Sequence, residues 1–137
     1  MIFKSADIES AARTVYGEAR GEPEQGKIAV AWVIRNRAKR GGWWGNDVDT
    51  VCRFPFAFSC WNNNDPNKSK ILKVGIEDES FRLCLIAVAA AFSDIAPDPT
   101  SGSTHYHVAS QPFPKSWGDP KEPAVIIGNH KFYNSVK

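Results

Sequence analysis

The 137-residue chain lacks a long hydrophobic run and a strong net charge, and each absence excludes a class of protein. No apolar stretch approaches the ~18 residues of a membrane-spanning helix, so we expect no membrane span. Lysine and arginine number 17 and aspartate and glutamate 15, which leaves a net charge of +2. Because nucleic-acid-binding domains usually carry a basic face, we expect no nucleic-acid partner.

The beginning of the chain, MIFKSADIES, lacks the apolar segment of a secretory signal peptide. We therefore expect synthesis in the cytoplasm without a signal peptide. The chain also lacks internal repeats and any linker long enough to separate domains. Its length and its 42% of hydrophobic residues suit one domain, residues 1–137, built on one core.

Cysteines are few: Cys52, Cys60 and Cys84 are an odd number and form no C-x-x-C pair, so they do not make a disulfide framework. Cys84 lies in the apolar run FRLCLIAVAAAF, where we expect a buried core thiol. Cys60 stands among aromatic residues, and a nucleophilic role for it would need a positioned histidine.

What the chain does contain is a glutamate at the end of a predicted helix. Apolar residues recur at helical spacing at Ile8, Ala11, Ala12, Val15 and Ala19, and Ser5 is the expected cap. Glu18 lies on the shoulder of this stripe, where it is partly buried. Burial favours the protonated form of a carboxyl group, which a general acid requires. An ordinary surface glutamate is the alternative that this pattern leaves open.

A second helix follows the corner Gly-Glu-Pro. Gly21 suits the end of the first helix, and Pro23 suits the first turn of the next one. Residues 28–34, IAVAWVI, contain no polar side chain, which predicts a helix passing through the core. A strand is the alternative for this run alone, but the alanine content and the length of the pattern favour a helix that Gly41 and Gly42 end.

The rest of the chain predicts a small α+β fold that is mainly helical. Residues 41–67 form an irregular, aromatic-rich insertion, whose rings either stack on sugars or pack beneath the loop; they are Trp43, Trp44, Phe54, Phe56, Phe58 and Trp61. Residues 79–92 predict a third helix. Residues 103–109 and 124–133 predict strands of a small antiparallel sheet that forms one wall of a cleft.

Three separated motifs occur in the chain. The first combines an EARGEP corner with the pattern G-x-x-A-V-A-x-V-x-x-N-R, which ends at Asn36 and Arg37. The second is FAFSCW, residues 56–61, followed by Asn64-Asp65-Pro66. The third is Thr104-His105-Tyr106-His107, followed by Ser116-Trp117 and by IGNHKFY at residues 127–133. Together these motifs resemble the spore cortex-lytic enzyme (SleB/CwlJ) family of cell wall hydrolases. The resemblance implies a peptidoglycan-degrading enzyme with a fold similar to goose-type lysozymes and lytic transglycosylases.

The resemblance and the residue patterns together give the expected site residues, and a structural role at the helix corner is the alternative for Glu22. Glu18 is the expected acid and base, without a cofactor or a metal ion. The residues expected to bind substrate are Glu22, Phe58, Ser59, Trp61, His105, Tyr106 and His107. The expected partner is a peptidoglycan glycan strand, cleaved at the β-1,4 bond between N-acetylmuramic acid and N-acetylglucosamine.

Two outcomes of this cleavage are open. A lytic transglycosylase forms 1,6-anhydromuramyl ends with one glutamate, whereas a hydrolytic muramidase normally uses a second carboxylate. Asp47, Asp49 and Asp65 are candidates for that carboxylate, but none stands out, which favours the transglycosylase. Because no signal peptide is expected, we further predict a monomeric phage or prophage endolysin. It would reach the cell wall through holin-dependent release.

Two alternatives come from other classes of protein. His105, His107 and His130 are the expected ligands of a zinc-dependent N-acetylmuramoyl-L-alanine amidase, with Glu18 or Glu22 as base or ligand. A carbohydrate-binding module without catalytic activity is the second alternative. Glu18 argues against it, because binding alone needs no carboxylate at that position.

Overall fold

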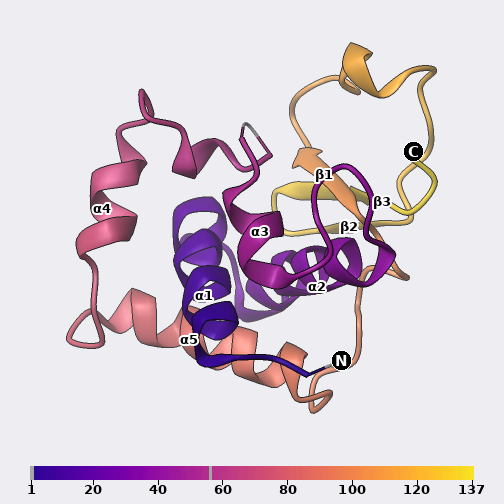
Figure 1. Ribbon diagram of the computed structural model, residues 1–137. Helices are drawn as coiled ribbons and strands as arrows, with labels where there is room; N and C mark the ends of the chain where they lie inside the picture. The colour runs from indigo at the N-terminus through magenta and orange to yellow at the C-terminus, as the bar shows by residue number, and fades with distance from the viewer. Residues whose placement is uncertain (1, 56) are drawn as a thin grey trace.

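The computed structural model describes residues 2–55 and 57–137, so Phe56 of the aromatic-rich insertion lies outside the described residues. Figure 1 shows the helices on one side and a small sheet on the other. The elements in chain order are α1 (Ser5–Ala19), α2 (Glu24–Arg40), α3 (Val48–Arg53), η1 (Ser59–Trp61), α4 (Asn67–Lys73), α5 (Glu79–Phe92), β1 (His105–Val108), η2 (Lys115–Trp117), β2 (Val125–Ile127) and β3 (His130–Tyr133). The predicted fold class, α+β and mainly helical with a small antiparallel sheet, is confirmed.

The core forms where α1, α2 and α5 pack against one another. In α2 the residues from Ala29 to Ala31, together with Val33 and Ile34, have no exposed surface, so this helix passes through the core as predicted. Pro23 precedes the helix as its cap residue, and Gly41, with φ of +68°, closes it by donating its amide to Arg37 O at 2.9 Å. Glycine adopts this positive φ without strain.

The cap of α1 differs from the prediction. Ser5 is the first helical residue and Lys4 is the cap residue, whose backbone amide donates to Asp7 Oδ2 at 2.9 Å. A carboxylate in the first turn both satisfies this amide and suits the positive end of the helix dipole. The predicted position of the helix is confirmed, but its cap is Lys4 with Asp7.

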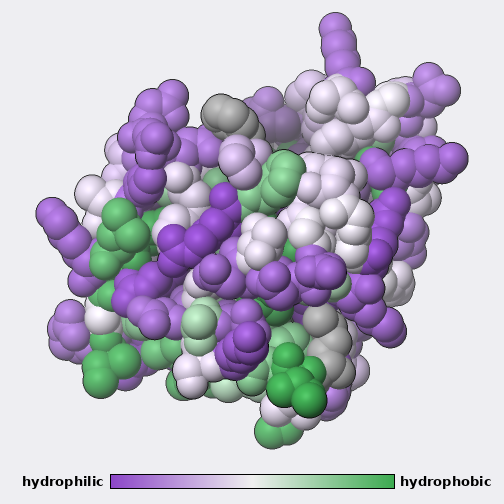
Figure 2. Space-filling view, in the orientation of Figure 1, coloured by the Kyte–Doolittle hydropathy of each residue, from purple (hydrophilic) through white to green (hydrophobic). Residues whose placement is uncertain are grey.

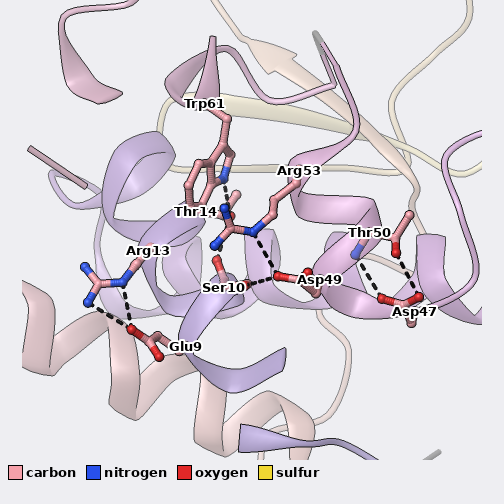
Figure 3. A network of polar contacts seen from close by, with 9 residues as sticks. All are labelled: Glu9, Ser10, Arg13, Thr14, Asp47, Asp49, Thr50, Arg53 and Trp61. Carbon is pink, nitrogen blue, oxygen red and sulfur yellow. Dashed lines mark hydrogen bonds and ion pairs between the residues drawn. The ribbon is translucent and has the colours of Figure 1, made fainter. Parts of the chain in front are cut away.

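The aromatic-rich insertion is more regular than predicted, because it contains α3 and η1. A polar network ties these elements to α1 (Figure 3). Asp49 of α3 accepts hydrogen bonds from Ser10 Oγ and from Arg53 Nε, the latter at 2.9 Å. Trp61 of η1 donates its indole N–H to Thr14 Oγ1 at 2.8 Å. Short helices gain most of their stability from such tertiary contacts, which a periodicity pattern does not contain.

The sheet has the order β1-β3-β2, with antiparallel neighbours. The predicted strand over 124–133 is in fact the hairpin β2–β3, because Gly128 turns the chain with φ of +55°. Tyr106 pairs with Phe132, and both lie on the face that packs on the helical core. His105, His107 and Tyr133 lie on the opposite face, where their rings contact Trp117 from the segment between β1 and β2.

Most large apolar side chains of the described residues are buried, and a few are exposed. Figure 2 shows them as separate green patches along the side of the molecule where α4 and α5 lie. The exposed large apolar residues of these two helices and of the segment between them include Leu72, Ile76, Leu83 and Ile86. Within the described residues no helix is both long and apolar enough to cross a membrane.

Candidate active site

A cleft of about 900 Å³ lies where the end of α1, the C-terminal half of α2, η1 and β1 come together. Its walls include Glu18, Arg37, Trp43, Ser59, Tyr106 and Trp117. His105 and His107 also line it. The structure therefore brings together, in one cavity, residues that the sequence analysis selected from three separate motifs.

Glu18 occupies the last turn of α1 and is half-buried at the cleft wall. Tyr106 Oη donates a hydrogen bond to Glu18 Oε1 at 2.6 Å. The preceding residue explains how η1 approaches so closely: a Cβ at Gly17 would lie 2.6 Å from Cys60 Cβ. Glycine at this position lets η1 pack directly behind Glu18, so the carboxyl group is held between Tyr106 and Cys60.

The hydroxyl of Tyr106 is kept protonated by its surroundings. Burial, and then the neighbouring Glu18, raise the pKa of Tyr106 well above its ordinary value. A protonated phenol is a hydrogen-bond donor, so Tyr106 always has a proton to offer Glu18. The arrangement orients the carboxyl group and stabilises negative charge on it.

Arg37 supplies a positive charge behind this pair. Its side chain is buried, donates from Nε to Thr104 O at 2.7 Å and lies between the rings of Trp44 and Phe58. Burial lowers the pKa of Arg37, while the nearby Tyr106 and Glu18 oppose that shift. A guanidinium keeps its charge even so, because its unperturbed pKa is far above neutral.

Arg37 lies in one of the sequence motifs but was not predicted as a site residue. The sequence nevertheless contained one indication that Arg37 is buried. Arg37 follows Val33 by four positions and Ile34 by three, so it continues the buried face of α2. A charged residue on a buried helix face usually has a specific partner or role.

The three histidines lie in different environments. His105 is buried, and its Nδ1 lies 2.9 Å from Thr104 Oγ1. Burial, together with the charges of Arg37 and Arg40, lowers the pKa of His105 to about 4, so its ring is neutral near pH 7. His107 Nε2 lies 2.8 Å from Tyr133 Oη.

These positions do not favour the zinc site of the amidase alternative. His130 pairs with Val108, so its side chain lies on the face of the sheet opposite to His105 and His107. The described part of the chain contains no group of three potential ligand side chains arranged to hold a metal ion. The predicted strands suggested that His130 lies near His105 and His107. The pairing of β1 with β3 instead places the ring of His130 on the other face of the sheet.

Glu22 was expected to bind substrate, with a structural role at the helix corner as the alternative, and its surroundings favour the structural role. Its side chain is buried, and its two oxygens accept hydrogen bonds from the backbone amide and from Nδ2 of Asn129, each at 2.8 Å. His130 Nδ1 lies 3.2 Å from Glu22 Oε1. Burial alone raises the pKa of Glu22, but the bonds from Asn129 and the charge of His130 outweigh it, so the pKa lies below its ordinary value. Glu22 joins the start of α2 to the β2–β3 turn.

Phe58 and Trp61 were also expected to contact substrate, and both are buried instead. Phe58 is 2% exposed and lies against the guanidinium of Arg37. Trp61 is 9% exposed, is bonded to Thr14 and is covered by Arg53. Neither lines the cleft, because η1 turns these rings inward to the core. The same turn leaves Ser59 exposed and at the cleft wall, as predicted.

The predicted candidates for a second carboxylate lie outside the cleft. Asp47 caps α3, where its side chain accepts from the amide of Thr50 at 2.9 Å, and Asp49 is occupied by Ser10 and Arg53 (Figure 3). Asp65 accepts from the amide of Asn67 at 2.8 Å. The carboxylate that lines the cleft besides Glu18, among the described residues, is Asp119, which the sequence analysis did not consider.

The cysteines are all buried and unpaired, as predicted for Cys84. Burial raises the pKa of the thiols of Cys52 and Cys84 to about 12 and about 11. Burial and the adjacent Glu18 raise the pKa of Cys60 as well. A thiol is a nucleophile only as the thiolate, so this environment argues against nucleophilic catalysis by Cys60.

Comparison with known proteins identifies the family. The cell wall hydrolase model matches residues 21–133, a range that begins after Glu18. A spore cortex-lytic enzyme of Halalkalibacterium halodurans is 36% identical over 104 residues, which cover 76% of this chain and 28% of that relative. The corresponding enzyme of Bacillus subtilis is 46% identical over 57 residues, 42% of this chain and 18% of the relative. The chain thus spans less than a third of the length of these relatives.

Two solved structures share the fold over almost the whole chain. The catalytic domain of the Bacillus cereus SleB protein aligns with a TM-score of 0.75 and 30% identity, covering 97% of this chain and 93% of that one. The catalytic domain of the germination-specific lytic transglycosylase SleB from Bacillus anthracis aligns with a TM-score of 0.72 and 30% identity, covering 96% and 97%. These matches confirm the resemblance on which the predicted lysozyme-like fold was based. The chain belongs to the cell wall hydrolase family.

Proposed function

We propose that the protein is a lytic transglycosylase that cleaves the β-1,4 bond between N-acetylmuramic acid and N-acetylglucosamine in peptidoglycan. The observation that carries the proposal is Glu18, a half-buried carboxyl group at the wall of a large cleft. It accepts a hydrogen bond from Tyr106 and has the charge of Arg37 nearby. A structural neighbour bears the name lytic transglycosylase, which supports the same chemistry here.

In the first step Glu18 donates its proton to the glycosidic oxygen. The bond between this oxygen and C1 of the muramic acid breaks, its electron pair stays on the oxygen, and C1 acquires oxocarbenium character. The leaving sugar gains a free 4-hydroxyl. Glu18 becomes a carboxylate, whose new charge Tyr106 stabilises through its hydrogen bond and Arg37 through its field.

In the second step the 6-hydroxyl of the same muramic acid attacks C1. The Glu18 carboxylate accepts the proton of that hydroxyl, which restores the acid and leaves a 1,6-anhydro ring. The cycle consumes no water and needs no second carboxylate. A single acid–base residue held by a neutral donor is therefore sufficient for this reaction.

One observation favours a second candidate, a hydrolytic muramidase. Asp119 lines the same cleft as Glu18 and is exposed there. A carboxylate across the cleft can activate a water molecule or stabilise the oxocarbenium state, and the product then has a reducing muramic end.

Mass spectrometry of the soluble fragments released from purified peptidoglycan tests the proposal. We expect anhydromuramyl ends, unchanged by a chelator and retained in Asp119→Asn. Reducing ends that disappear in Asp119→Asn would instead establish the muramidase. Free stem peptides that disappear with chelator would establish an amidase.

The origin and release of the protein remain predictions. We expect a phage or prophage endolysin that acts as a monomer on the bacterial cell wall after holin-dependent release. Lysis of cells that express the chain with and without a holin measures this directly.

A further inference from the structure

We infer that Trp43 forms a binding subsite for a sugar ring at the wall of the cleft. The inference rests on the proposed function for the class of ligand, a β-1,4-linked N-acetylhexosamine strand. Trp43 is 60% exposed, whereas Trp44 beside it is 1% exposed. Among the exposed large apolar side chains of residues 2–55 and 57–137, Trp43 and Val108 line the cleft. A tryptophan left exposed inside a cavity has its largest apolar surface available to a ligand.

The backbone around Trp43 is held in place by a tight turn. Gly45 N donates to Gly42 O at 3.1 Å, which puts Trp43 and Trp44 at the two central positions of the turn. Gly42 and Gly45 both have positive φ. A Cβ at Gly45 would lie 2.5 Å from Thr50 Cγ2, so the turn is seated directly against α3. The turn therefore holds the backbone of Trp43 in one position against α3.

Side chains fix the ring as well. Trp44 anchors the turn, because its buried indole N–H donates to Arg37 O at 2.9 Å. The ring of Trp43 packs on Trp44, with centroids 4.7 Å apart, and against the ring of Phe54 at 5.3 Å. Two supporting rings on the protein side leave the remaining surface of Trp43 for a ligand. Because the ring is already held, binding costs little conformational entropy.

The chemistry of the cleft selects a sugar as this ligand. Pyranose rings present flat arrays of C–H groups that pack on an indole face, while their hydroxyls stay in water or bond polar groups. Trp43 lines the same cavity as Glu18, so a strand whose glycosidic bond lies at the carboxyl group extends along the cavity walls. Trp117 differs, because its ring is packed among His105, His107, Phe113 and Tyr133.

The indole N–H groups provide a direct signal for the test. Trp32, Trp44 and Trp61 donate to Ala96 O, Arg37 O and Thr14 Oγ1. Trp43 and Trp117 donate to no group among the described residues, so their N–H resonances report on the cleft. Substitution of Trp43 by Phe removes one resonance and assigns it.

The experiment titrates chitohexaose, a β-1,4 N-acetylglucosamine oligomer, into the ¹⁵N-labelled Glu18→Gln protein. We expect the Trp43 indole resonance to shift on binding. We expect Trp43→Ala to weaken binding by about tenfold or more, as for a truncated aromatic anchor, and Trp43→Phe to keep most of the affinity. Ile126→Ala is the matched control, because Ile126 is 56% exposed and does not line the cleft.

An unchanged affinity in Trp43→Ala, with an unshifted Trp43 resonance, would overturn the inference. Thermal unfolding of each variant verifies that the fold is kept. Failure of the inference can be told apart from failure of the proposed function, because the proposed function fails if the fragments released by the wild-type protein lack anhydromuramyl ends, whatever the affinity of Trp43→Ala. In the active protein, Trp43→Ala should raise KM on long glycan strands and leave kcat nearly unchanged.

Discussion

Glu18 in the last turn of α1 and Glu22 in the turn that leads to α2 lie at the same helical corner, and the two side chains have opposite surroundings. Glu18 accepts a hydrogen bond from Tyr106 and lines the cleft. Glu22 accepts two from Asn129, lies beside His130 and is buried. A carboxylate has about four acceptor sites, so Glu18 retains capacity to exchange a proton with a ligand, whereas Glu22 is occupied by the protein.

Both glutamates connect the helical corner to the sheet. Glu22 binds the turn between β2 and β3, and Glu18 binds β1 through Tyr106. Because β1 pairs with β3, fixing the turn also fixes the position of Tyr106 relative to the end of α1. The buried Glu22 thus holds the geometry in which Glu18, the proposed acid and base, is placed.

The largest effect is expected from Glu18→Gln. Glutamine can still accept the hydrogen bond from Tyr106, so the fold is kept, but it has no proton to donate to the glycosidic oxygen. We expect peptidoglycan cleavage to fall by at least about a thousandfold, since loss of an acid–base group removes its whole contribution. Release of soluble fragments measures the rate, and thermal unfolding provides the control. Substantial residual cleavage would contradict the assignment of Glu18.

A smaller effect, on stability instead of catalysis, is expected from Glu22→Gln. The amide nitrogen of glutamine would face a donor of Asn129, so one buried hydrogen bond is lost and the contact with His130 is weakened. We expect the free energy of unfolding to fall by about 2 kcal/mol, in the range for hydrogen bonds to charged groups. Urea unfolding measures this change.

The control for this variant is its activity well below its melting temperature. We expect cleavage within a few-fold of the wild-type rate, because Glu22 does not line the cleft. An activity loss as large as that of Glu18→Gln would contradict a structural role for Glu22 and indicate that it contributes to catalysis as much as Glu18 does.

The same comparison shows which features the sequence contained. The helices α1, α2 and α5 are long, and their apolar patterns predicted them with small errors at the ends. The helices α3 and α4 have six and seven residues and were missed. Asp47 caps α3, and both helices pack against α1 through contacts that no local pattern records.

The sequence predicted several residues that line the cleft, but it did not predict the hydrogen bonds that hold them. Glu18, Ser59, His105, Tyr106 and His107 were selected, and all line the cleft. The bond between Tyr106 and Glu18 joins positions 88 apart, and that between Asn129 and Glu22 joins positions 107 apart. Residue spacing within a single helix or strand could not predict either hydrogen bond, because each bond joins two different elements. For this reason Glu22 was assigned to substrate, and Phe58 and Trp61 were not recognised as buried.

A smaller loss of activity than that of Glu18→Gln is expected from Tyr106→Phe. Phenylalanine keeps the packing on Phe132 but removes the donor to Glu18 Oε1. The carboxylate formed in the first step then loses one stabilising hydrogen bond, and we expect kcat to fall by about tenfold. KM should change little if Tyr106 acts on Glu18 and not on the substrate. A rise in KM at constant kcat would place Tyr106 among the substrate-binding residues instead.

The smallest effect is expected in the dependence of stability on pH. The pKa of Glu22 is lower in the folded protein than its ordinary 4.5, so its contribution is present above that pH and is lost as the pH falls through the folded value. Urea unfolding at several pH values should show that the wild-type protein loses stability below pH 4.5 more steeply than Glu22→Gln does. The difference cannot exceed about 1.4 kcal/mol per pH unit, the slope for one proton.

The pKa of Asp49 is also lowered, chiefly by Ser10, so part of the wild-type slope should remain in Glu22→Gln and disappear when Asp49→Asn is added. Equal slopes in the wild-type protein and Glu22→Gln would show that Glu22 does not hold the corner as a carboxylate.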